Sequence, residues 1–176
     1  MNPEIIRTPN LTADEAAFIL RQAHQALAER GKFRLALSGG NTPRPIYTEF
    51  GRLAHDLPWE SVRFTFGDER CVPPGDPASN CRMARESLFD LCAISEKSIL
   101  RMRGEIEPHL AAQEYEHALA LLATQHGETI YRHDLILLGM GADGHTALPF
   151  PGTAALSASK SGEWCRTSFQ NWNPGA

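Results

Sequence analysis

The segment Gly139–His145 carries the residue types best suited to chemistry. Three of its seven residues are glycines, which let a backbone approach a ligand closely. Asp143 and His145 stand two positions apart, so the carboxylate could orient the imidazole or raise its basicity. An imidazole with an ordinary pKa of about 6.5 suits a general base at neutral pH. We therefore predict Asp143 and His145 as catalytic residues, with Gly141 close to the substrate.

A second glycine-containing segment follows an apolar stretch over residues 33–37 and precedes a helical pattern. Glycine backbone and the N–H groups of a helix N-terminus together suit an anion, although a tight turn without a ligand would explain the same residues. Hydroxyl groups and one arginine add further donors here. The predicted phosphate-binding residues are Ser38, Gly39, Gly40, Thr42 and Arg44.

Three consecutive charged residues, Asp68, Glu69 and Arg70, follow a second predicted strand over residues 62–66. A solvated turn is one interpretation of such a run. In the functional interpretation, Arg70 binds or polarises an anionic or carbonyl oxygen, and Asp68 or Glu69 holds the arginine in place. Asn80 and its neighbour Ser79 could reach the same site.

Helical and strand patterns alternate along the chain, which predicts a mostly parallel sheet flanked by helices. Ligands bind beyond the carboxyl ends of such strands, where all three polar segments fall. A capping box at Thr12 predicts the first helix start, and Gly31 its end. Further helices are expected over 43–53 and 108–124, and strands over 33–37, 62–66, 97–102 and 134–138, the last covered on both sides.

Bulk properties restrict the class of protein. A chain of 176 residues with 42% hydrophobic and 22% charged residues suits one globular domain. Its net charge of −4 argues against a nucleic-acid partner. With no bilayer-length apolar run and no signal pattern, we expect a cytoplasmic monomer or weak oligomer without membrane contact. The four cysteines lack paired spacing, and no metal or other cofactor is expected.

Three stretches together resemble the 6-phosphogluconolactonase family: LALSGGNTPRPIY, FTFGDERCVPPGDPASN and DLILLGMGADGHTALPFPGT. Their order and spacing make the resemblance specific. It implies a Rossmann-like α/β fold like those of glucosamine-6-phosphate deaminase, ribose-5-phosphate isomerase and the CoA transferases. It also implies metal-free hydrolysis of 6-phospho-D-glucono-1,5-lactone to 6-phospho-D-gluconate in the pentose phosphate pathway.

The resemblance also implies residue roles. Gly39, Gly40 and Thr42 would hold the phosphate, Arg70 would contact the substrate, and His145 would activate the hydrolytic water. A glucosamine-6-phosphate deaminase is a rival enzyme, although Arg70 stands where deaminases carry tyrosine. A non-catalytic sugar-phosphate binder or an inactive remnant is the alternative from another class.

The resemblance ends at Trp164, so residues 1–164 are interpreted as an incomplete lactonase domain and 165–176 as a tail foreign to the family. A frameshift after Trp164 would produce such a tail. We expect the sheet then to lack the family's last strands, which leaves an unpaired edge. Such a chain should be poorly soluble and have little or no lactonase activity.

Overall fold

The computed structural model describes residues 4–141, 144 and 146. Its strands are β1 (Phe33–Leu37), β2 (Val62–Phe66) and β3 (Leu135–Ile136). The α-helices are α1 (Leu11–Arg30), α2 (Pro43–Leu53), α3 (Asn80–Ala84) and α4 (Pro108–Gln125). Shorter turns are η1 (Trp59–Ser61), the π-helical η2 (Arg85–Phe89) and η3 (Glu96–Ser98).

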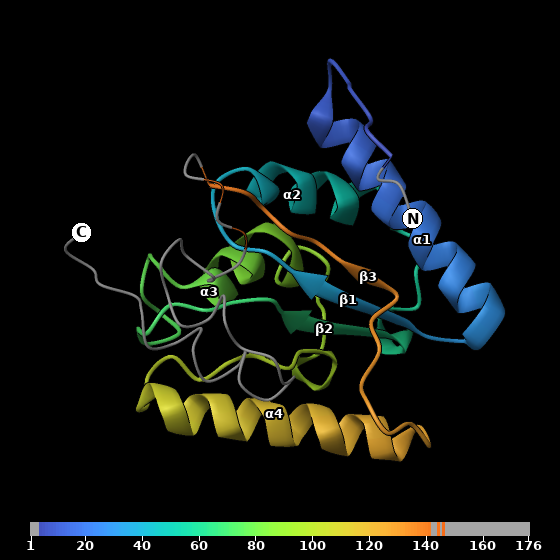
Figure 1. Cartoon of the computed structure of the whole chain (residues 1–176). Coiled ribbons are helices and arrows are strands. Elements are labelled where there is room, and N and C mark those ends of the chain that lie inside the picture. Colours follow the sequence, from blue (N-terminus) through green and yellow to red (C-terminus); the bar gives the residue numbers. More distant parts are fainter. Residues whose placement is uncertain (1–3, 142–143, 145, 147–176) are drawn as a thin grey trace.

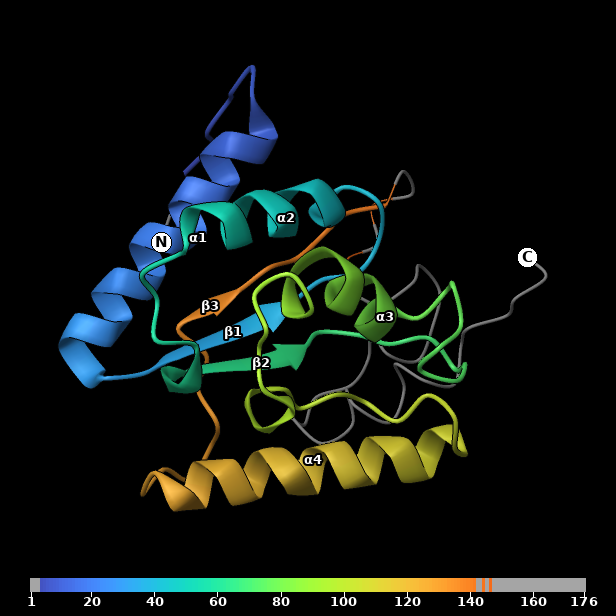
Figure 2. The same cartoon turned by 180° about the vertical axis from the view of Figure 1, so that it is seen from behind.

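The strands form a parallel sheet in the order β2-β1-β3, with helices on both faces. Helices α1 and α2 pack together on one face, and α4 lies on the other (Figures 1 and 2). This arrangement confirms the predicted α/β class. Because the strands are parallel, their carboxyl ends share one edge of the sheet, and the segments that follow β1 and β2 leave from it.

Strand β1 is the centre of the core, and all five of its residues are buried. One of them is charged, since Arg34 is only 4% exposed. Its guanidinium donates to both carboxylate oxygens of Glu128 at 2.7 and 2.9 Å and lies 4.7 Å from the ring centroid of Tyr131. The backbone N–H of Arg34 donates to the Asp134 carboxylate at 2.7 Å. A buried charge is tolerated when it is paired in this way, and the pairing ties β1 to the segment before β3.

Three sequence predictions differ from the structure. Helix α1 is capped by the Asn10 side chain, which accepts from the Ala13 N–H at 3.3 Å, so Thr12 lies inside the first turn. The predicted strand over 97–102 is reduced to one parallel bridge between Phe64 and Ile99, because Ser95 caps η3 just before it.

The third difference concerns the strand expected over 134–138, which is shorter than predicted and is not covered on both sides. Its Ile136 is 51% exposed and the following Leu138 is 61% exposed, whereas Leu137 is buried. In the part of the chain that the structure describes, β3 has one neighbouring strand, β1. A run of apolar residues therefore did not distinguish a covered strand from one at the border of the described sheet.

No helix among the described residues is long and apolar enough to cross a membrane.

The end of α1 depends on Gly31, which confirms the predicted stop. Its φ of 67° lies in the left-handed region, and a Cβ there would meet no atom within 4 Å.

We predict that Gly31→Ala lowers the free energy of unfolding by about 1 kcal/mol, because only the backbone is strained. Urea titration measures this change. Gly75→Ala is the matched control, since Gly75 also has open space but no positive φ; an equal loss in both variants would contradict the account.

Candidate active site

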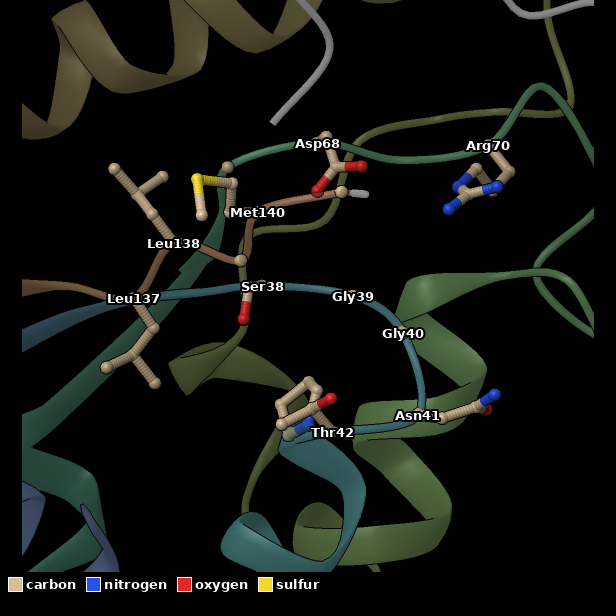
Figure 3. Close-up of a pocket in the computed structure, with 14 residues that line it drawn as sticks. Ser38, Gly39, Gly40, Asn41, Thr42, Asp68, Arg70, Leu137, Leu138 and Met140 are labelled. Carbon is tan, nitrogen blue, oxygen red and sulfur yellow. The ribbon is translucent and has the colours of Figure 1, made fainter. Parts of the chain in front are cut away.

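A pocket of about 380 Å³ opens where the segments after β1, β2 and β3 meet (Figure 3). We call these segments the first loop (38–43), the second loop (67–70) and the third loop (137–141). The volume is within the range of small-molecule sites, which run from about 300 to 1,000 Å³. All three loops contribute to the lining, so the sheet brings together segments that are up to about 100 residues apart in sequence.

Most of the predicted site residues in the described part of the chain line this pocket. They are Ser38, Gly39, Gly40, Thr42, Asp68, Arg70 and Gly141. Arg44 is not among the lining residues, because its position on α2 directs it to Glu86, with which it pairs at 3.1 Å. Asp143 and His145 lie outside the described residues. The lining also includes apolar side chains that sequence reasoning had not singled out as ligand contacts, Leu137 and Leu138 among them.

The first loop leads into α2, whose N-terminus is poor in hydrogen-bond donors. Pro43 and Pro45 carry no N–H, which removes two of the donors that a helix start normally presents. The Thr42 hydroxyl makes no capping bond in the part of the chain that the structure describes. An anion here would therefore depend on the N–H groups of the loop itself, on this hydroxyl and on the helix dipole.

Buried tyrosines fix the carboxyl ends of both longer strands. The Tyr47 hydroxyl, from α2, accepts from the Ser38 N–H at 2.9 Å and donates to the Ser38 carbonyl at 2.8 Å. On the other face, the Tyr115 hydroxyl of α4 accepts from the Phe66 N–H at 2.9 Å and donates to its carbonyl at 3.1 Å. Burial raises the pKa of Tyr47, so this hydroxyl keeps its proton. Each pair of bonds holds the backbone at the point where a loop departs.

The three charged residues of the second loop point in different directions. Asp68 and Arg70 line the pocket, whereas Glu69 is 3% exposed and turns toward α3. Its carboxylate accepts from the N–H groups of Arg70, Asn80 and Cys81 at 2.7 to 2.9 Å and from the Ser79 hydroxyl at 3.1 Å. Burial raises the pKa of Glu69, and these hydrogen bonds oppose that effect. Glu69 is thus the acid that holds the Arg70 backbone.

Among the described residues that line the pocket, Arg70 and Asp68 carry the charged side chains. Figure 3 shows the Asp68 carboxylate and the Arg70 guanidinium on the same side of the first loop. Arg70 lines the pocket, so its guanidinium is placed to meet an anionic or carbonyl oxygen, and its buried Nε has no hydrogen-bond partner among the described residues. The described residues contain no group of three or more His, Cys, Asp or Glu side chains that could hold a metal.

Comparison with known proteins identifies the family. Residues 7–175 match the model of the glucosamine-6-phosphate isomerases/6-phosphogluconolactonase family. The chain belongs to this family. A 6-phosphogluconolactonase from Synechocystis is 46% identical over 134 residues, which are 76% of this chain and 55% of the relative. The corresponding Treponema pallidum protein is 42% identical over 138 residues, or 77% of this chain and 56% of the relative.

A solved family structure has the same arrangement. The crystal structure of 6-phosphogluconolactonase from Thermotoga maritima superimposes with a TM-score of 0.74 at 27% identity, covering 83% of this chain and 63% of that one. The chain therefore spans a little over half the length of the curated relatives named above. The described fold is the family's fold over the part that is shared.

The hydroxyl of Tyr47 contributes to stability through its two hydrogen bonds to Ser38. We predict that Tyr47→Phe lowers the free energy of unfolding by about 1–3 kcal/mol, because the Ser38 N–H and carbonyl lose their partner. Tyr131→Phe is the matched control, since the Tyr131 hydroxyl is buried without a partner among the described residues. Denaturant unfolding compares the two variants. A loss as large in Tyr131→Phe as in Tyr47→Phe would show that the hydrogen bonds are not the cause.

Proposed function

We propose that this chain hydrolyses 6-phospho-D-glucono-1,5-lactone to 6-phospho-D-gluconate, with His145 as the general base. The end of the resemblance at Trp164 led us to expect little or no activity, but all three loops still line one pocket. The observation that carries the proposal is the single pocket shared by the glycine-rich first loop, by Arg70 and by the third loop that leads to His145. The 6-phosphogluconolactonase relatives favour the lactone over the amino-sugar phosphate of a deaminase.

Each end of the substrate has a matching part of the pocket. The phosphate dianion suits the N–H groups of Gly39 and Gly40 and the Thr42 hydroxyl at the positive end of α2. The lactone carbonyl suits Arg70, whose guanidinium would stabilise the oxyanion that forms on attack. The lining hydroxyl of Ser38 adds a further donor on the first loop.

The reaction needs one proton acceptor and no covalent intermediate. His145 takes a proton from water as the water oxygen attacks the lactone carbonyl carbon, and a tetrahedral oxyanion forms. The carbonyl then re-forms, the bond to the ring oxygen breaks, and that oxygen takes up the proton as a hydroxyl. Asp143 would hold the imidazole in the tautomer that accepts the proton, and Asp68 would lie beside the reacting groups with Arg70.

A non-catalytic sugar-phosphate binder is the second candidate, because the chain spans only 55% of the Synechocystis relative. Such a binder would use the same first loop, so ligand binding does not separate the two functions. Turnover does. The lactone also opens in water without an enzyme, and the rate must therefore be measured above that background.

Replacing the proposed base gives the decisive comparison. We expect His145→Ala to lower kcat by about 10²–10⁴-fold, since it removes the proton acceptor while the phosphate contacts stay. The control is His117→Ala, a change on the exposed surface of α4. Acid release in a weakly buffered solution reports the rate. Lactone hydrolysis that is unchanged in His145→Ala would refute the role of this histidine, and a wild-type chain that binds 6-phosphogluconate without turnover would favour the binder.

A further inference from the structure

The first residue of α3, Asn80, was expected from the sequence to reach the site, but it is not among the residues that line the pocket. It is 3% exposed, so its amide is almost wholly out of water. Its Nδ2 donates to the Asp68 carbonyl oxygen at 3.1 Å, and its backbone N–H donates to Glu69 at 2.7 Å. Asn80 is therefore fixed to the second loop at two points.

The same amide lies directly against the first loop. A Cβ placed on Gly39 would be 2.0 Å from the Asn80 Oδ1, 2.2 Å from its Cγ and 2.4 Å from its Nδ2. Contacts this short cannot exist, and the amide is buried and hydrogen-bonded, so it cannot simply swing away. Position 39 must therefore lack a side chain because Asn80 occupies the volume that one would need.

We propose that Asn80 is a positioning residue that sets the spacing between the first and second loops of the pocket. One face of its side chain limits how closely Gly39 can approach, and its amide hydrogen bond holds the backbone of Asp68. The groups assigned to the phosphate belong to the first loop, and Arg70, assigned to the lactone carbonyl, belongs to the second loop. The inference rests on the proposed function, and it deepens that function by naming what fixes the distance between its two halves.

Spacing of this kind affects turnover because the substrate must contact both loops at once. A displacement of about 1 Å in an active site can cost about 100-fold in rate. A side chain on Gly39 would push the first loop away from Asn80, which separates the phosphate contacts from Arg70. Removing the amide would clear the space and would also free the Asp68 carbonyl from its hydrogen bond.

A double-mutant cycle tests the proposal on the full chain. Gly39→Ala should lower kcat/KM by about 100-fold, and Asn80→Ala should lower it by less. Gly39→Ala combined with Asn80→Ala should recover to the level of Asn80→Ala alone, because the truncated residue leaves room for the new methyl group. The control cycle replaces Gly39→Ala with Gly75→Ala, whose Cβ would meet no atom within 4 Å and should show no coupling to Asn80→Ala.

The outcomes separate this inference from the proposed function. If the wild-type chain turns over the lactone and the double variant is no better than Gly39→Ala, the positioning role is wrong and the function stands. If the wild type binds 6-phosphogluconate without turning over the lactone, the proposed function is wrong. The positioning role of Asn80 is then tested by the same double-mutant cycle, measured on the dissociation constant of 6-phosphogluconate. Should Gly39→Ala not fold, a folded double variant in urea titration supports the proposal, and an unfolded one overturns it.

Discussion

The carboxylate of Glu69 accepts three backbone N–H groups and one hydroxyl while almost fully removed from water. One of these donors belongs to Arg70 in the second loop, and two belong to the first turn of α3. A buried carboxylate is costly unless its oxygens are satisfied, and here the N-terminus of a helix satisfies them. The loop that carries Asp68 and Arg70 can keep its shape only while α3 stays in place.

Other buried polar groups extend this dependence to the rest of the pocket. Tyr47 and Tyr115 bind the backbone at the ends of β1 and β2 from opposite faces of the sheet. Asn80 then links α3 to the backbone of Asp68 and lies against Gly39. Hydrogen bonds of this kind are strong in a low-dielectric interior and costly to leave unmade. The apolar core positions the strands, and these polar contacts position the loops.

The sequence alone was sufficient to predict which loops lie together at the site. Parallel strands share a carboxyl edge, so recognising buried strands before Ser38 and Gly67 placed their loops together without further information. The orientation of Asp68, Glu69 and Arg70 was left open, although the alternation of an extended segment would have set Glu69 apart from its neighbours. Three of the four partners named for that carboxylate lie 10 to 12 residues further along, at the start of a helix whose packing the local pattern does not reveal.

Contacts between residues that are far apart in the sequence could not be predicted from local sequence patterns. The hydroxyl of Tyr115 donates to the Phe66 carbonyl across 49 residues, a contact that the helical pattern over 108–124 does not reveal. Arg44 looked suitable for a phosphate because of its place after the first loop, yet Glu86, 42 residues away, pairs with it. The exposure of Ile136 likewise depends on how many strands flank β3, which its own apolar sequence does not specify.

The central claim is that the three loops form one site for a phosphorylated sugar acid or its lactone. A crystal structure of the chain with 6-phospho-D-gluconate tests it most directly. We expect the phosphate to lie against Gly39, Gly40 and Thr42, with Arg70 in contact with the same molecule. A phosphate bound away from the first loop, or a ligand that leaves Arg70 without contact, would contradict it.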